Sequence, residues 1–193
     1  MGGTKKNSER FYIDHQLTPV VVSYEALSRW RDFLISRSSH LSIAIKLNTG
    51  MNRFGFDERD VDLFCSQISK FNCFSIKLVM SHLACADAPH HPLNHIQLSR
   101  FVDFSNRISQ VVEVELRSLA NSSGIFLGSD FHFDMVRPGA ALYGINPQPR
   151  SPNPLRNAVS FKLPLRSIRQ TESDGDVGYG ATRPISAGET LAV

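Results

Sequence analysis

Segments with the pattern of buried strands alternate with segments of helical pattern over the first 140 residues, and this alternation constrains the fold most. Short apolar runs predict strands over Leu17–Ser23, Leu41–Leu47, Ser75–Met80 and Glu115–Ala120, with a further short strand near Met135–Arg137. Helices are expected between them, over Tyr24–Ser36, Asp57–Lys70 and Pro92–Ser109. Strands that alternate with helices form parallel sheets through right-handed crossovers. We therefore predict an α/β fold, a partial (β/α) TIM-type barrel with about half of the usual strands.

Polar and charged side chains gather where the expected strands end. They are Asn48–Arg53 after the second strand, His82 after the third, Asn121 and Ser122 after the fourth, and Arg137 on the last. In a β/α barrel the loops at the carboxyl ends of the strands meet at one face, and this face carries the chemistry. These residues are therefore the candidates for a functional site.

The sequence pattern changes after Gly144. Residues 146–157 contain four of the ten prolines and are expected to form a linker. Beyond them, residues 158–193 alternate apolar and polar side chains as strands do. A few strands with unpaired edges do not form an independent unit. We therefore expect these residues to be the start of an all-β C-terminal domain.

Composition narrows the class of protein. The chain is 41% hydrophobic and 20% charged, and its net charge of +3 is spread along its length. This balance predicts a globular protein and gives no reason to expect a nucleic-acid or membrane partner. No apolar run approaches the roughly 20 residues of a membrane helix, and the first residues lack the pattern of a signal peptide. A cytoplasmic location is the expectation.

Cysteines and histidines do not predict a metal site. The three cysteines, Cys65, Cys73 and Cys85, have no C-x-x-C or zinc spacing and are expected to be reduced thiols. The spacing of His90, His91 and His95 fits no common metal site, so we expect a solvated loop there.

Five stretches together resemble the bacterial alanine racemase family, whose members use pyridoxal 5′-phosphate (PLP). The stretches are Lys46–Phe56, Ser81–Asp87, Leu119–Gly124, Met135–Gly144 and Val177–Thr182. They occur in the family's order and leave residues 1–10 as an unmatched extension. The family has a β/α barrel followed by a β-rich domain. The resemblance thus implies that residues 11–145 are the C-terminal half of the PLP-binding barrel, 146–157 a linker, and 158–193 the first strands of the C-terminal β domain.

The resemblance implies interconversion of L-alanine and D-alanine, a cytoplasmic source of D-alanine for peptidoglycan. The reaction uses a PLP imine and two bases on opposite faces of the amino acid. In the family one base is the lysine that holds PLP, and the other is a tyrosine from the second subunit of a homodimer, matched here by Tyr179. Because a free tyrosine has a pKa of about 10, its phenolate needs support. The resemblance assigns this support to His82, with Arg137 behind it and directed at the pyridine nitrogen. The expected catalytic residues are thus Tyr179, His82 and Arg137.

Further matches imply binding roles. Arg53 matches the residue that binds the substrate carboxylate, although an isolated arginine would be interpreted as a surface residue. Lys46 matches a position that is carbamylated in many members, and an ordinary strand lysine is the alternative. Asn48 stands where aspartate is also common.

The phosphate of PLP requires hydroxyl and backbone N–H donors at close approach. By resemblance Ser122, Asn121, Gly139 and Ala140 provide them, while Arg137 faces the pyridine ring. The alternative for Ser122 is a helix N-cap.

The family's lysine motif, K-x-x-A-Y-G-H-G, does not occur in this sequence. We therefore expect a fragment of an alanine racemase, truncated at both ends and inactive alone. Two alternatives remain open. A second polypeptide supplies the lysine half of a split racemase, or the chain is a non-catalytic PLP-binding module.

Overall fold

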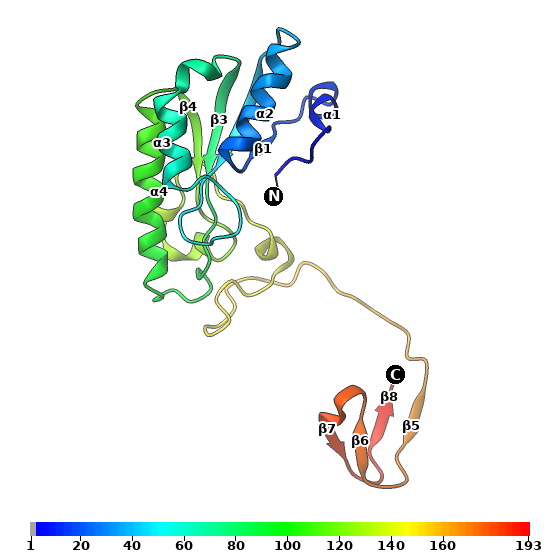
Figure 1. Cartoon of the computed structure of the whole chain (residues 1–193). Coiled ribbons are helices and arrows are strands. Elements are labelled where there is room, and N and C mark those ends of the chain that lie inside the picture. Colours follow the sequence, from blue (N-terminus) through cyan, green and yellow to red (C-terminus); the bar gives the residue numbers. More distant parts are fainter. Residues whose placement is uncertain (1–2) are drawn as a thin grey trace. The chain divides into compact units, whose positions relative to one another are not determined.

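The computed structural model describes residues 3–193, which form two compact units (Figure 1). The first unit ends at Ala158, and the second comprises Val159–Val193. Each unit is described by itself below. No helix within the described residues is both long enough and apolar enough to cross a membrane.

A four-stranded parallel sheet forms the centre of the first unit. Its strands follow one another in chain order: β1 (Val20–Val21), β2 (Leu41–Lys46), β3 (Phe74–Met80) and β4 (Val114–Ser118). Successive strands are connected through helices α2 (Tyr24–Ile35), α3 (Glu58–Ser66) and α4 (Leu93–Ser109), which run along the sheet in Figure 1. The predicted α/β partial barrel is thereby confirmed for this unit.

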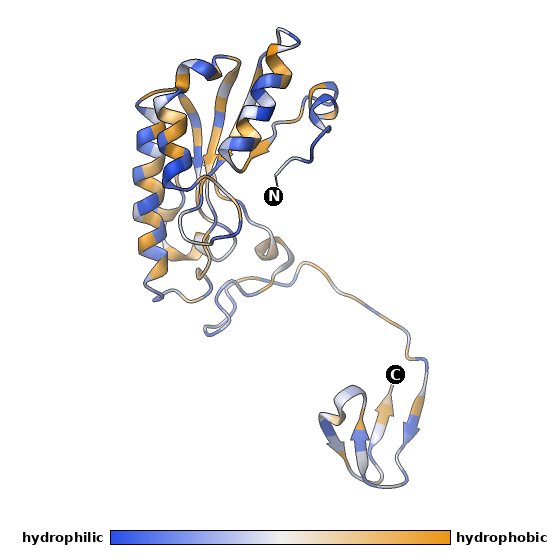
Figure 2. Ribbon diagram, viewed as in Figure 1, coloured by the Kyte–Doolittle hydropathy of each residue, from blue (hydrophilic) through white to orange (hydrophobic). Residues whose placement is uncertain are grey.

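Helices α2, α3 and α4 cover one face of the sheet and enclose the core, whereas α1 (Glu9–Asp14) lies beside α2 (Figure 1). Short 3₁₀ turns follow at Ile68–Phe71, Gly124–Leu127, Ser129–Phe131 and Ala140–Tyr143. Trp30, Phe64 and Phe101 are fully buried between helices and sheet, and Figure 2 shows the apolar strands behind the mixed outer faces of the helices. Apolar burial of this kind is the main stabilising contribution to such a fold.

Helices α2 and α3 both begin at side-chain caps. The Ser23 hydroxyl accepts a hydrogen bond from the N–H of Ala26 at 3.1 Å, and the Asp57 carboxylate accepts from the N–H of Asp60 at 2.9 Å. Such caps satisfy backbone donors that have no partner inside the helix.

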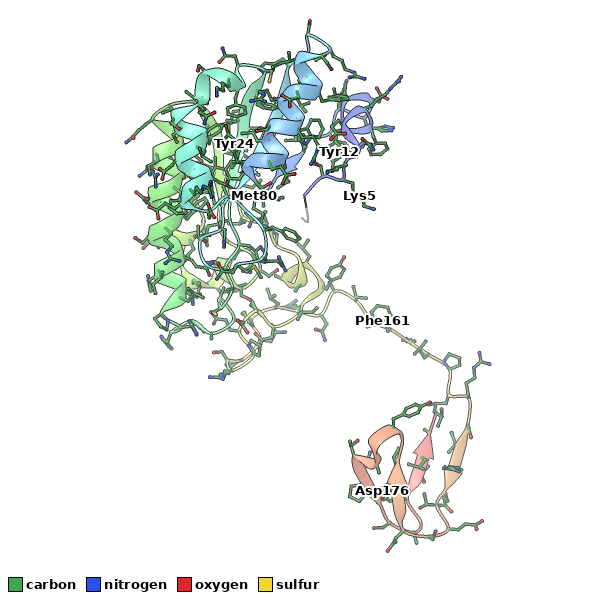
Figure 3. All side chains as sticks on the ribbon, viewed as in Figure 1. Lys5, Tyr12, Tyr24, Met80, Phe161 and Asp176 are labelled. Atoms are coloured by element: carbon green, nitrogen blue, oxygen red, sulfur yellow. The ribbon has the colours of Figure 1, made fainter. Side chains whose placement is uncertain are left out.

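The amino-terminal segment packs against α2. The indole N–H of Trp30 donates to the Thr4 hydroxyl at 3.0 Å, and Arg29 forms an ion pair of 2.9 Å with the buried Glu9. Tyr12 meets the Trp30 ring edge to face at 5.7 Å, and Figure 3 shows it beside α2. The described part of the expected extension, residues 3–10, therefore belongs to the first unit; residues 1 and 2 lie outside the described residues.

Three local expectations were wrong. The first strand is only Val20–Val21, because only these two residues pair with β2 and Ser23 already caps α2. The helix expected over Asp57–Lys70 ends at Ser66, where Gln67 leaves the helical conformation and a 3₁₀ turn brings Phe71 onto the core. The strand near Met135–Arg137 is a single bridge between Arg137 and Asn121, since the next residue, Pro138, has no N–H for a ladder.

The expected linker folds onto the first unit without regular secondary structure. The Asn153 side chain donates to the carbonyl of Gly144 at 2.8 Å, and the Gln148 side chain donates to the carbonyl of Phe126 at 3.3 Å. The boundary between the units therefore follows Ala158.

The second unit contains two short antiparallel ladders. Strand β5 (Ile168–Gln170) pairs with β8 (Thr190–Ala192), and β6 (Gly175–Val177) pairs with β7 (Arg183–Ile185). Residues 159–167 precede the ladders without strand structure, and the side chain of Phe161, labelled in Figure 3, is 92% exposed. The strands expected from Ala158 thus begin only at Ile168.

Candidate active site

The carboxyl ends of β2, β3 and β4 lie together, and the loops that follow them carry the predicted residues of the first unit. Lys46, Met80 and Ser118 are neighbours in register across these three strand ends. Met80, which is labelled in Figure 3, is the last residue of β3. His82 follows β3 by two residues, and Asn121 follows β4 by three. The order of the strands therefore places these side chains at one edge of the sheet.

Backbone hydrogen bonds join the two ends of the loop that carries Arg53, and the side chain of Asn48 holds its interior. The N–H of Phe56 donates to the carbonyl of Lys46 at 2.7 Å, and the N–H of Asn48 donates to the carbonyl of Phe56 at 2.8 Å. Within the loop, the Asn48 side chain accepts from the N–H of Asn52 at 2.9 Å and donates to its side-chain oxygen at 3.1 Å. These local bonds give the loop one conformation and fix the backbone just before Arg53.

Gly55 permits the closure of this loop. Its φ is +129°, a conformation that side chains disfavour. A β-carbon at this position would lie 2.5 Å from the carbonyl carbon of Leu47 and 2.6 Å from the nitrogen of Asn48. The close approach of the two backbone segments therefore depends on the absence of a side chain.

Arg137 is fixed by acceptors at the carboxyl ends of β3 and β4. Its Nη1 donates to the Ser118 hydroxyl, and its Nη2 donates to the carbonyls of Ser81 and Leu119. Burial lowers the pKa of Arg137 to about 10, so the guanidinium stays charged at neutral pH. Its Nε is buried, and no residue in the range 3–193 accepts a hydrogen bond from it. Buried donors without an acceptor are rare, and this N–H is available to an acceptor atom of a bound ligand.

His82 faces the Asn121 side chain. The oxygen of that amide accepts from the N–H of Gly124 at 2.9 Å, which fixes its orientation. The amide nitrogen consequently lies 3.4 Å from Nε2 of His82 and donates to it. This arrangement leaves the proton of a neutral His82 ring on Nδ1.

The site carries a concentration of positive charge. Burial is the main cause that lowers the pKa of His82 to about 4, and the charges of Arg137, Lys46 and Arg53 lower it further. Burial also lowers the pKa of Lys46, followed by the charges of Arg53 and Arg137. His82 is therefore neutral at pH 7 beside neighbours that attract anions.

Ser122 gathers backbone donors from the segment after Arg137. Its hydroxyl accepts from the N–H of Gly139 at 2.8 Å and of Ala141 at 3.2 Å, at the start of the 3₁₀ turn Ala140–Tyr143. The alternative role of Ser122 as a helix cap is wrong, because Asn121 bonds the first N–H of the following turn instead. A hydroxyl beside convergent N–H groups can bind an anion.

Tyr179 lies in the second unit, in a 3₁₀ turn between Gly178 and Gly180, which both have a φ of +73°. Its phenol is fully exposed. The structure describes Tyr179 within this unit only, so its role beside His82 and Arg137 stays a prediction.

The histidine-rich loop shows other contacts. In the loop, Nδ1 of His91 accepts from the N–H of Leu93 at 3.1 Å. His95 lies on helix α4 and not in the expected loop, and its ring packs against Phe131. Among residues 3–193, no three His, Cys, Asp or Glu side chains group as metal ligands would.

Sequence reasoning missed three buried polar residues behind the site, Thr49, Ser81 and Gln97, each at most 1% exposed. Gln97 occupies a core-facing position of α4, on the same face as Phe101, Phe104 and Ile108. A polar residue inside an apolar helical stripe was the available signal.

Comparison with known proteins assigns the family. The family model described as "Alanine racemase, N-terminal domain" matches residues 1–147, which is most of the chain. The chain belongs to this family. The match includes residues 1–10, which the motifs alone had left outside the resemblance.

Curated relatives extend the likeness beyond this domain. An alanine racemase of Rhodospirillum rubrum is 36% identical over 192 residues, which cover 100% of this chain and 50% of that protein. A catabolic alanine racemase of Mesorhizobium japonicum is 39% identical over 180 residues, 93% of this chain and 46% of the relative. The chain therefore spans about half the length of the alanine racemases it matches.

Solved structures of alanine racemases have the same fold. The enzyme of Bartonella henselae, with covalently bound pyridoxal phosphate, superposes with a TM-score of 0.82 at 30% identity, over 100% of this chain and 52% of that one. The enzyme of Streptomyces coelicolor gives a TM-score of 0.83 at 26% identity, over 98% and 52%. The sheet, helices and strand-end loops described above are thus those of an alanine racemase barrel domain.

Proposed function

We propose that this chain forms part of an alanine racemase that interconverts L-alanine and D-alanine with PLP as cofactor. The observation that carries the proposal is the buried, unpaired Nε of Arg137, beside the neutral His82 and the cationic Arg53 and Lys46. Membership of the racemase family supports the same reaction. We place this reaction in the cytoplasm, where it would provide D-alanine for peptidoglycan.

The residues present fit PLP. The hydroxyl hydrogen of Ser122 and the N–H of Ala140, at the start of its 3₁₀ turn, suit a phosphate group, and Asn121 holds the adjoining turn. The Gly139 N–H, which donates to Ser122 in this structure, would have to turn toward the phosphate to contribute. The unpaired donor of Arg137 suits an aromatic ring nitrogen, which accepts one hydrogen bond. PLP, when bound, would supply the electron sink that makes the Cα proton of an amino acid removable.

Arg137 is suited to keep its acceptor unprotonated. A guanidinium has donors only, and this one is held charged by three acceptors from the protein. It would donate a hydrogen bond to a ring nitrogen of PLP and keep its own proton, which would favour simple proton exchange over other reactions of amino acids.

Arg53 and Tyr179 complete the proposed roles. The Arg53 guanidinium would bind the substrate carboxylate, with Lys46, carbamylated or not, beside it. The phenol of Tyr179, contributed by the second subunit of a homodimer, would act as one base, with His82 as its hydrogen-bond partner. Because His82 is neutral at pH 7, its Nδ1–H can donate to a phenolate.

A second base requires a lysine from a K-x-x-A-Y-G-H-G motif, which this sequence does not contain. We infer that turnover depends on a polypeptide segment with this motif, on a longer chain or on a separate one. The 193 residues alone should then lack activity, because loss of one base costs several orders of magnitude in rate.

Co-expression tests the proposal. The chain is produced alone and together with a polypeptide that comprises the preceding half of a related racemase, and D-alanine formation from L-alanine is measured with PLP added. We expect turnover only in the pair, and its loss when Tyr179→Phe is introduced or the motif lysine is changed to alanine. Turnover by the chain alone, or an active pair that tolerates Tyr179→Phe, would contradict the proposal.

A further inference from the structure

One side-chain amide connects the two strand ends that carry the site. Nε2 of Gln97, on α4, donates to the carbonyl of His82 at 3.0 Å and to the Thr49 hydroxyl at 3.2 Å. Its Oε1 accepts from the N–H of Ala84 at 2.9 Å. All hydrogen-bonding hydrogens of this amide are thereby used, and its side chain is completely buried.

The network continues to β2 with a single direction of donation. The Ser81 hydroxyl donates to the carbonyl of Leu47 at 2.8 Å, since a carbonyl can only accept. The Thr49 hydroxyl, 2.8 Å from Ser81, must then donate to Ser81 and accept from Gln97. A reversed Gln97 amide would place its oxygen against the carbonyl of His82, so this network permits one orientation.

The loop after β2 rests on the same part of α4. A β-carbon on Gly50 would lie 3.3 Å from Leu93 and 3.4 Å from Gln97, and Arg100 donates to the carbonyl of Thr49 at 3.4 Å. The segment that leads to Arg53 therefore packs directly against the residue that holds His82.

Gln97 forms hydrogen bonds with the backbone on both sides of Leu83. It bonds the carbonyl of His82 and the N–H of Ala84, whereas Arg137 bonds the carbonyl of Ser81. His82 thus lies between two anchored peptide groups, which fix the backbone from which its ring projects, and the Asn121 amide contacts the ring itself at 3.4 Å.

We infer that Gln97 is a positioning residue for His82, which it holds in the buried, cation-facing orientation that the proposed racemase reaction requires. This inference rests on the proposed function for its purpose and on the hydrogen-bond network for its evidence. The groups that face the ring are the charges of Arg137, Lys46 and Arg53 and the Asn121 amide.

The test is an NMR titration of His82 in the full chain with labelled histidine, its signal identified by its absence in His82→Gln. Gln97→Met keeps the length of the side chain and removes its hydrogen bonds. We expect the pKa of His82 to rise by at least about one unit toward its ordinary value, because a freed ring reaches water. An unchanged pKa in a folded Gln97→Met variant overturns the inference.

Asn94→Leu is the matched control. Asn94 is a buried amide on the same helix, 1% exposed, and its nitrogen donates to the carbonyls of Ala88 and Pro89, away from His82. We expect it to leave the pKa of His82 unchanged. An equal rise of the His82 pKa in this variant would mean that any destabilisation of α4 raises it, and would also overturn the inference.

Amide exchange decides the matter if Gln97→Met does not fold. The side chain of Ala84 is exposed, yet its N–H bonds to a buried acceptor, so we expect its exchange to be as slow as that of the strand amides. If the N–H of Ala84 exchanges as fast as the amides of an exposed loop, its hydrogen bond to Gln97 does not hold this segment and the inference is refuted. None of these measurements needs turnover, so a failure of the proposed racemase activity leaves their outcome separate.

Discussion

Replacement of Gly55 by alanine should destabilise the first unit strongly, because two separate costs meet at this position. A side chain at a φ of +129° costs about 1–3 kcal/mol of backbone strain. Its β-carbon would also lie 2.5–2.9 Å from backbone atoms of Leu47 and Asn48, which must move apart. Such overpacking typically costs about 1–3 kcal/mol more. We therefore expect Gly55→Ala to lose about 2–6 kcal/mol of unfolding free energy, a large part of the usual total.

Gly128→Ala separates the two costs. Gly128 has a φ of +118° and a ψ of 169°, but nothing lies within 4 Å of a β-carbon placed there. This variant should show the backbone strain alone, about 1–3 kcal/mol.

Urea unfolding measures both variants against the unchanged chain. Trp30 is the only tryptophan and is fully buried in the first unit, so its fluorescence reports the unfolding of that unit. We expect a lower midpoint at an unchanged slope for both variants, with the larger shift for Gly55→Ala. A Gly55→Ala variant no less stable than Gly128→Ala would refute the argument from the close approach.

Three further predictions concern other contacts. Ser23→Ala removes the acceptor of the Ala26 N–H and should cost about 1 kcal/mol in the same urea assay; an unchanged midpoint would deny the cap a role. Thr4→Val leaves the buried indole N–H of Trp30 without its acceptor, which should shift the tryptophan emission and cost about 1–3 kcal/mol; identical spectra would contradict the bond. Burial and neighbouring charge lower the pKa of folded His82 to about 4, whereas the unfolded residue titrates near 6.5. Protons therefore favour the unfolded chain between these values, so stability should be fully present above pH 6.5 and fall as the pH drops toward 4. Urea midpoints at pH 7 and pH 5 should show a smaller loss of stability in His82→Gln than in the unchanged chain. An equal loss in both proteins would mean that another group causes it.

Much of the first unit was predictable because its pattern is local. Helix α2 begins at the expected Tyr24 and ends one residue before the expected Ser36, since its cap and apolar stripe both lie in its own sequence. Strand β2 likewise ends one residue before the expected Leu47. The expectation near Met135 failed because an extended stretch before Pro138 resembles a strand, although its partner and the proline permit only one bridge.

The candidate site likewise contains some residues that local sequence predicts and others that it does not. His82, Arg53 and Arg137 could be named from motifs and from their positions after strands. Gln97 could not, because its importance comes from contact with Thr49, 48 residues earlier, which only the packing of α4 against the loop creates. The role proposed for Tyr179 requires a second subunit, which no local pattern specifies.

The contacts of Thr4 and Glu9 have a practical consequence for anyone who shortens this protein. A polypeptide that starts after Glu9 would leave the guanidinium of Arg29 and the indole of Trp30 without their acceptors. The loss of these contacts with α2 would alter the Trp30 fluorescence used to follow folding, although Trp30 lies far from the deletion in sequence. Poor folding of such a truncated protein would result from the lost contacts between the amino-terminal segment and α2, and it would give no information about catalysis.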